Sequence, residues 1–202
     1  MKTIRALIPA AMAVWACSSI WAADALADCD AKAKQSTPTT QFKFLSGGIS
    51  VLDTKTGLEW QRCPEGMMFA AGKAVDRSLD SCMGTASTFN PTTIKMAAGK
   101  VNSSSGLDGQ HDWRVPTMDE LSSIVESACQ IPAINPTVFP GTPVTWFWAL
   151  QAKSLPSGGQ AWGIGFGMGG YYVGNNNYGA VRLVRGAFNP KNVLERPRNP
   201  GK

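Results

Sequence analysis

The sequence predicts an exported domain of the α+β class, with two helices and a mostly antiparallel sheet joined by long loops. Three observations predict it. Short apolar stretches bounded by turn residues recur along the chain and are typical of strands. Two other stretches begin with residues that cap helices. The chain opens with positive charges followed by an apolar run, which is the pattern of a secretory signal.

Residues 1–27 are predicted to be a signal peptide. The apolar run covers residues 6–21 and small residues follow it, so we place cleavage after Ala27, although two earlier alanines fit the same rule. An uncleaved anchor is less favoured because the run is short for a bilayer span. A lipoprotein signal at Cys17 is less favoured because bulky Trp15 stands where a small residue is usual. We therefore expect a periplasmic, outer-surface or secreted protein with no transmembrane segment after cleavage.

Four cysteines remain after cleavage, and an even number in an exported chain predicts two disulfides. Of the three possible connectivities we favour Cys63–Cys82 with Cys29–Cys129. The first closes a loop of about 20 residues, which contributes on the order of 3 kcal/mol in the chain-entropy model. The second would tie an N-terminal arm to the domain. A zinc site is less favoured because there is no CxxC pair and His111 is the only histidine, so we expect no metal and no cofactor.

The first elements after cleavage are a polar arm and a hairpin. Residues 28–41 are polar and predict the arm. Strands are expected at residues 49–52 and 58–61, because Gly57 between them can take the positive φ of a tight turn. Residues 63–90 show no regular pattern, and we expect a loop clipped by the Cys63–Cys82 disulfide.

Two helices are expected next. The first covers residues 90–101, with Asn90 as its cap and a proline in its first turn. The second begins at Thr117, where Glu120 can reach back to complete a capping box. Apolar residues at helical spacing extend this second helix as far as Ala128.

The C-terminal third predicts strands at residues 145–149, 161–166 and 180–185, the last of which closes the sheet. A short segment rich in Asn and Tyr, residues 171–178, precedes it. The tail, residues 188–202, is basic and proline-rich, and its prolines prevent a helix. We expect this tail to be a solvated end, with contact to an acidic surface as the alternative.

Several motifs together carry a family resemblance. Residues 56–61 resemble a TGLMW signature, and residues 112–121 resemble a DWRLPT-x-x-EL signature. The ending VRLVR follows at residues 181–185. Over about residues 42–187 the chain resembles the Lcl C-terminal domain family, named for a Legionella collagen-like adhesin. Because structure alone explains the motif residues, we assign structural roles to Trp60, Asp112, Trp113, Arg114, Pro116, Thr117 and Glu120.

The resemblance implies a C-type-lectin-like fold, related to that of the formylglycine-generating enzyme, with two helices, a twisted and mostly antiparallel sheet, and long loops. The naming member of the family is an adhesin that recognises sulfated glycosaminoglycans and assembles as a trimer. The sequence contains no collagen-like stalk of the kind that accompanies that trimer. A homo-oligomer, and a trimer in particular, is therefore implied by resemblance alone.

Catalysis is not expected. Formylglycine-generating enzymes hold copper with a pair of cysteines late in the chain, whereas no cysteine follows Cys129 in this sequence. A nucleophile triad would depend on His111 as its one possible imidazole base. The calcium-binding EPN and WND motifs of true C-type lectins are also missing from the sequence, so we do not expect calcium-dependent sugar binding.

The aromatic segment from residue 146 to residue 178 predicts a binding surface. Aromatic faces stack on sugar rings, asparagine amides pair with hydroxyls, and glycines let a ligand approach the backbone. We expect Trp60, Trp113, Trp148 and Trp162 in the core instead. The candidate ligand-binding residues are Trp146, Tyr171, Tyr172, Asn175, Asn176, Asn177 and Tyr178.

The predicted function is a non-catalytic binding or adhesion module that recognises a glycan, including anionic glycans, or a protein at the cell surface. The full chain carries a net charge of +5, an excess too mild to identify a partner, and we expect no nucleic acid partner. The alternative is a structural subunit that binds protein partners in pilus or envelope assembly.

Overall fold

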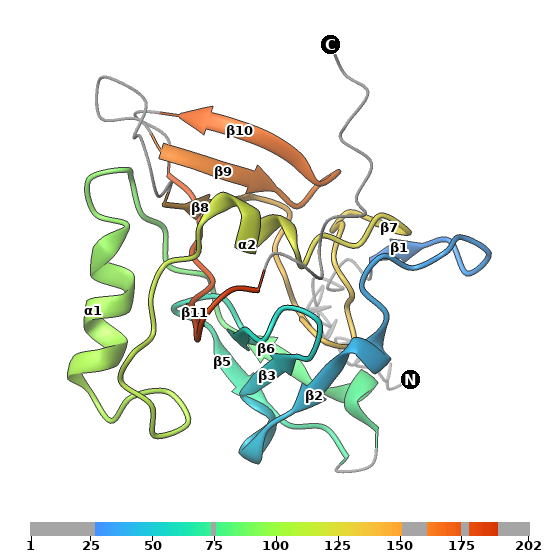
Figure 1. The fold of residues 1–202 in the computed structure, drawn as a ribbon, viewed down its shortest axis with the longest axis horizontal. Helices are drawn as coiled ribbons and strands as arrows, with labels where there is room; N and C mark the ends of the chain where they lie inside the picture. The colour runs from blue at the N-terminus through green and yellow to red at the C-terminus, as the bar shows by residue number, and fades with distance from the viewer. Residues whose placement is uncertain (1–26, 74–75, 151–160, 175–177, 190–202) are drawn as a thin grey trace, which may run out of the picture.

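The computed structural model describes residues 27–73, 76–150, 161–174 and 178–189, and it has the predicted α+β architecture (Figure 1). The described strands pair antiparallel in four separate sheets, and helix α2 lies between the two larger sheets. The predicted signal peptide up to residue 26, the tail from residue 190 and the run Asn175–Asn177 lie outside the described residues.

The four-stranded sheet contains the predicted hairpin. Gly57 has a φ of 76°, and its amide donates to the carbonyl of Asp53, which closes the turn. Both strands of the hairpin begin one residue later than the sequence predicts. The strands lie in the order β11-β4-β3-β2. Their bounds are β2 Phe42–Phe44, β3 Ser50–Asp53, β4 Glu59–Gln61 and β11 Val184–Arg185.

The three-stranded sheet is separate from the first, contrary to the single sheet that we expected. It has the order β10-β9-β8. The segment at residues 180–185 passes from one sheet to the other, because Ala180 bridges Phe147 while Val184 pairs with Trp60. Only its last two residues form a strand. The bounds are β8 Trp146–Ala149, β9 Ala161–Gly165 and β10 Gly170–Gly174.

Residues 63–90 are more regular than the sequence indicates. They hold a short hairpin of β5 (Met68–Ala70) and β6 (Ser81–Met83), linked by the 3-10 turn η3 (Arg77–Leu79). The Cys63–Cys82 disulfide joins this hairpin to the end of β4. Strands this short carry too weak an alternation to be recognised from sequence. Two further 3-10 turns are η1 (Thr39–Gln41) and η2 (Ser46–Gly48).

Both helices are shorter than predicted. α1 covers Lys95–Ser103, because Asn90 caps a preceding turn, where its side-chain oxygen accepts from the amides of Thr92 and Thr93. α2 covers Met118–Ser122 and ends well before Ala128. The next residues leave the helix to pair elsewhere, since the amide of Glu126 donates to Ala133. The capping box at the start of α2 is present as predicted.

The N-terminal arm packs against the domain. The Cys29–Cys129 disulfide joins β1 (Asp28–Cys29) to β7 (Cys129–Gln130), so both predicted disulfides are present. Further along the arm, the carboxylate of Glu126 accepts from the amides of Ser36 and Thr37 at 2.8 and 2.7 Å. Thr37 is buried as a result.

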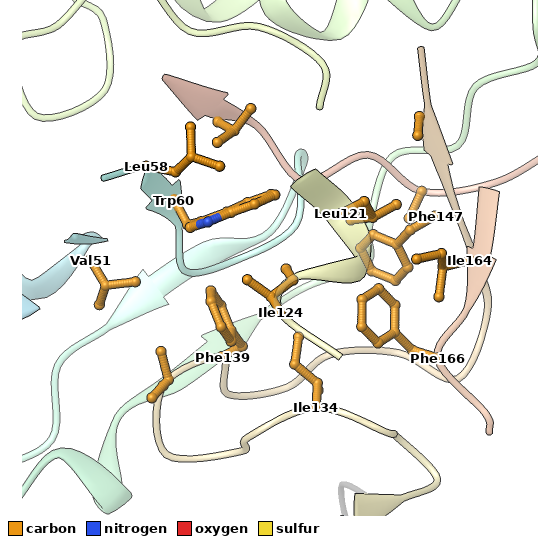
Figure 2. Close-up of a cluster of buried hydrophobic side chains, with 14 of the residues drawn as sticks. Val51, Leu58, Trp60, Leu121, Ile124, Ile134, Phe139, Phe147, Ile164 and Phe166 are labelled. Carbon is orange, nitrogen blue, oxygen red and sulfur yellow. The ribbon is translucent and has the colours of Figure 1, made fainter. Parts of the chain in front are cut away.

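The main core joins the two larger sheets through α2. Figure 2 shows Leu121 and Ile124 between Trp60 on one side and Phe147 on the other. The rings of Phe147 and Phe166 meet edge to face with centroids 5.0 Å apart. This packing fixes the three-stranded sheet relative to the rest of the fold. The labelled core residues are Val51, Leu58, Trp60, Leu121, Ile124, Ile134, Phe139, Phe147, Ile164 and Phe166.

Candidate functional site

The residues of the DWRVPT motif form a network that holds the fold together. Arg114 donates two hydrogen bonds of 2.7 Å to the carboxylate of Glu120. The same carboxylate accepts from the amide of Thr117, as the capping box requires. Burial by itself would raise the pKa of Glu120, but these hydrogen bonds and the charge of Arg114 hold it below its ordinary value.

The rest of the motif ties this network to β11 and to the core. Arg185 bridges the carboxylates of Asp112 and Glu59 at 2.6 and 2.5 Å. Trp113 is buried, and its indole nitrogen donates to the carbonyl of Leu107. Pro116 is buried, and its carbonyl accepts from the amide of Leu150 beyond β8. These side chains are occupied by contacts within the protein.

Two fully buried arginines lie next to strands of the four-stranded sheet: Arg62 follows β4 and Arg182 precedes β11. Arg62 forms a 2.6 Å ion pair with Asp80, and its guanidinium stacks on Phe44. Arg182 has no carboxylate partner among the described residues, and it donates instead to carbonyls and to the hydroxyl of Thr142. Burial and the nearby charge of Arg62 lower the pKa of Arg182 to about 9, so it is charged at neutral pH.

A pocket of about 360 Å³ opens where β8 begins and the β9–β10 turn passes beside it. Two of the predicted ligand-binding residues, Trp146 and Tyr171, contribute to its wall. None of the described residues in its lining is charged. The described residues that line the pocket are Val144, Thr145, Trp146, Gly165, Gly167, Met168, Gly170 and Tyr171.

The indole of Trp146 rests on the backbone of β9. Trp146 pairs with Gly165 across the sheet, and Gly165 in turn pairs with Gly170. A Cβ atom at Gly165 would lie 2.5 Å from the six-membered ring of Trp146, so that only glycine leaves room for the ring. The two glycines therefore provide a flat support for an indole that also lines the pocket.

A second tryptophan lies over a glycine two residues earlier in β9, but this tryptophan is buried. Gly163 pairs with Trp148, and a Cβ at Gly163 would lie 3.1 Å from the Trp148 ring. Trp148 is fully buried, and its indole nitrogen donates to the carbonyl of Phe89. Trp146 is partly exposed. Of the two rings that lie over glycines of β9, only the outer one lines the pocket.

The rim of the pocket is apolar and exposed. Met168 is 84 % exposed and Tyr171 is 57 % exposed, and Val144 is exposed beside them. Sequence reasoning did not identify Val144, Thr145 or Met168. The available signal for Met168 was its place in a glycine-rich turn between two predicted strands, where a large apolar side chain has little to pack against.

Of the other predicted ligand-binding residues, the structure describes Tyr178 and the backbone of Tyr172. Tyr178 is 63 % exposed but does not line the pocket. The backbone of Tyr172 lies in β10 opposite Gly163, and its side chain is outside what the structure describes. The three asparagines at 175–177 lie outside the described residues.

His111 occupies an exposed loop, where its Nδ1 lies 3.0 Å from the carbonyl of Asn102. Within the described ranges, no three His, Cys, Asp or Glu side chains come together as a metal site would require. No helix in the part of the chain that the structure describes is long and apolar enough to cross a membrane.

Comparison with known families gives one match. The family described as the Lcl C-terminal domain matches residues 50–185, which is most of the chain. The matched region includes the motif network, the strands of both larger sheets except β2, and every described residue of the pocket. No match was found among curated proteins or among solved structures.

Proposed function

Because the chain belongs to the Lcl C-terminal domain family, we propose that it is an exported, non-catalytic binding and adhesion module with a C-type-lectin-like fold. Its ligand, a glycan or a protein at the cell surface, binds in the pocket beside Trp146. One observation carries this proposal. An indole supported by Gly165 lines an open pocket whose rim is apolar and exposed.

Two properties of the pocket support a binding role. Exposed apolar groups gathered around a concavity are typical of interaction sites. Aromatic side chains that are half exposed combine a large contact area with a polar edge. The motif network contrasts with this, since Arg114, Glu120 and Arg185 are engaged in ion pairs within the protein.

The location of His111 supports a non-catalytic role. Its imidazole is exposed, and its Nδ1 faces a backbone carbonyl rather than a hydroxyl or thiol nucleophile. Cys29, Cys63, Cys82 and Cys129 are engaged in disulfides, so none of these four provides a thiol nucleophile. The two disulfides also support export, because such bonds persist in oxidising compartments.

A direct test compares adhesion by the purified protein and its pocket variants. Trp146→Ala with Tyr171→Ala should weaken binding to cell-surface glycans or envelope proteins by at least about tenfold, a loss of about 1.4 kcal/mol. Tyr178→Ala is the matched control, because Tyr178 is equally exposed but lies outside the pocket lining. Unchanged adhesion by the pocket variant, with an unchanged melting curve, would place the ligand site elsewhere.

A second candidate is a subunit for assembly with protein partners, and one observation favours it. Met68 and Met83 face each other across the β5–β6 hairpin, and both are exposed together with Leu79 from the connecting turn. Met68→Gln with Met83→Gln should disrupt assembly and leave pocket binding unchanged if this surface has such a role. A homo-oligomer, with the trimer of the naming member as its model, is also part of the proposal, and light scattering of the purified protein tests it.

A further inference from the structure

We infer that the protein forms a two-fold symmetric dimer, in which strand β10 of one copy pairs antiparallel with β10 of a second copy. The inference goes beyond the proposed ligand pocket, and it specifies the surface and the symmetry of the homo-oligomer that the proposed function includes. Three features of β10 carry it: its place at the edge of a sheet, the direction of its backbone groups and a sequence that can pair with itself.

Strand β10 forms one edge of the three-stranded sheet. The sheet has the order β10-β9-β8, and Figure 1 shows β10 at the rim of the fold with β9 beside it. The opposite edge is covered, because the amide of Trp148 in β8 donates to the carbonyl of Ala180 at 2.9 Å. A further strand can therefore extend this sheet only at β10.

The odd-numbered residues of β9 direct their backbone groups toward β10. Successive residues of an antiparallel strand bond alternately to the two sides. The amide of Phe166, just after β9, donates to the carbonyl of Thr145, just before β8, which continues the register of these two strands. The even-numbered residues of β9 therefore bond with β8, and Gly163 and Gly165 bond with β10.

The same alternation gives two residues of β10 backbone groups that face outward. Gly170 and Tyr172 lie opposite the two odd-numbered glycines of β9, so they bond with β9. Tyr171 and Val173 consequently direct their amides and carbonyls away from the sheet. Among the described residues, neither of these two forms a backbone hydrogen bond outside the strand ladder. The outer edge thus offers two donors and two acceptors to a further strand.

The sequence of β10, Gly-Tyr-Tyr-Val-Gly, is suited to pairing with a second copy of itself. An antiparallel pairing centred on Tyr172 places Tyr171 of one copy opposite Val173 of the other, and glycine opposite glycine at both ends. Each Tyr171–Val173 pair exchanges both of its backbone hydrogen bonds, and symmetry supplies this pair twice. An aromatic side chain opposite a β-branched one also stabilises a sheet.

The charge distribution favours contact between copies at this edge. The chain carries a net charge of +5, which opposes self-association, but β10 contains no charged residue and no proline. Exposed Lys43 stands in β2, at the edge of the four-stranded sheet. Lysine and proline in edge strands are the usual means of preventing such pairing. Tyr171 is 57 % exposed, and the second copy would cover it.

The first experiment measures the mass of the purified exported protein over a range of concentrations by sedimentation equilibrium. We expect a monomer–dimer equilibrium, because two five-residue strands bury less area than a standard interface. Val173→Pro removes an outward amide that the ladder with β9 does not use, so it should raise the dissociation constant of the dimer by about tenfold or more. Val173→Thr keeps the amide and the β-branched shape and should dimerise as the original protein does.

A cysteine at the symmetry axis tests the register. Residue 172 of each copy would face the other as a non-hydrogen-bonded pair, with Cα atoms about 4.5 Å apart, a distance that a disulfide spans. Tyr172→Cys should therefore yield a covalent dimer on non-reducing electrophoresis. Val173→Cys is the control, because the two copies of residue 173 would be diagonal neighbours about 7–8 Å apart, too far for the bond.

A trimer would overturn the inference and keep the homo-oligomer of the proposed function, whereas a monomer at every concentration would overturn both. A dimer that Val173→Pro leaves unchanged and that Tyr172→Cys does not link would use another surface, which also refutes pairing through β10. If the Val173→Pro protein does not fold, cross-linking at residue 172 decides. None of these measurements involves a ligand, so their failure leaves the proposed adhesion function standing.

Discussion

The two larger sheets of this protein use their polar and aromatic residues in opposite ways. Around the four-stranded sheet, charged groups such as Arg62, Asp80 and Glu120 are buried or paired. At the outer end of the three-stranded sheet, the pocket has aromatic rings and hydroxyls but no charge among its described residues. The difference teaches that the residues by which the family is recognised maintain the fold, whereas the proposed binding site lies in a glycine-rich segment outside the main motif.

The largest expected effect comes from the two disulfides. Cys29–Cys129 lies at β7, next to the pocket, and Cys63–Cys82 lies at the four-stranded sheet. Their partners are 100 and 19 residues apart. The chain-entropy model assigns about 4.7 kcal/mol to a loop of the longer kind and about 3 kcal/mol to one of the shorter kind. Cys29→Ser with Cys129→Ser should therefore lower the free energy of unfolding more than Cys63→Ser with Cys82→Ser, as measured in urea.

The same two variants should differ in ligand binding. Cys129 lies in β7, and the amide of Ile131 just beyond it donates to the carbonyl of Gly167 in the pocket wall. Loss of the Cys29–Cys129 bond should weaken binding, whereas loss of the Cys63–Cys82 bond should not. Equal effects on binding would show that the pocket does not depend on β7.

The next effect concerns the buried ion pair. Asp80→Ala leaves the Arg62 guanidinium buried without its carboxylate, which should cost about 3–5 kcal/mol of stability. Asp112→Ala removes an exposed partner of Arg185 and should cost less than about 1 kcal/mol. Urea unfolding of both variants gives the comparison. Similar losses of stability in the two variants would mean that the buried Arg62–Asp80 pair contributes no more than the exposed Arg185–Asp112 pair.

A smaller effect should be visible as a dependence on pH. Burial by itself would raise the pKa of Glu126, but hydrogen bonds from the amides of Ala128, Ser36 and Thr37 hold it below its ordinary value. The unfolded chain therefore binds this proton more readily. The stability from Glu126 is present above the unfolded pKa of about 4.3 and is lost as the pH falls through the lower folded pKa.

Glu126→Gln should lower stability at neutral pH by about 1–3 kcal/mol and flatten the acid end of the stability curve. Chemical unfolding at neutral pH and at about pH 3 measures both effects. Asp30→Asn, on the exposed part of the same arm, is the control. If the stability of the Glu126→Gln variant falls in acid as steeply as that of the original protein, contacts other than this carboxylate hold the arm.

Local signals explain which parts of the fold were predictable. Gly57 and the Thr117 capping box act within a few residues, and both are formed as the sequence indicates. The end of α2 was not predictable, because it depends on Glu126 and Ala133 meeting in the folded chain. The β5–β6 hairpin was missed because three-residue strands carry little alternation.

The candidate site was predictable only in part. Trp146 and Tyr171 were identified because aromatic rings close to asparagines and glycines are typical of a sugar-binding surface. Thr145 and Val144 were missed because nothing in their local sequence shows that β8 begins beside the β9–β10 turn. That proximity arises from the packing of Phe147, Phe166 and the residues around them.

The disulfide of the N-terminal arm also has a mechanical consequence for the proposed adhesion. A pulling force applied at residue 28 reaches the body of the domain through the covalent bond at Cys129. The chain between Cys29 and Cys129 carries none of this tension, so β2 to β6 and both helices are shielded from extension. The force enters the fold at β7, next to the pocket wall. A tether and the bound ligand would thus pull on neighbouring points, and the rest of the domain would stay folded under strain.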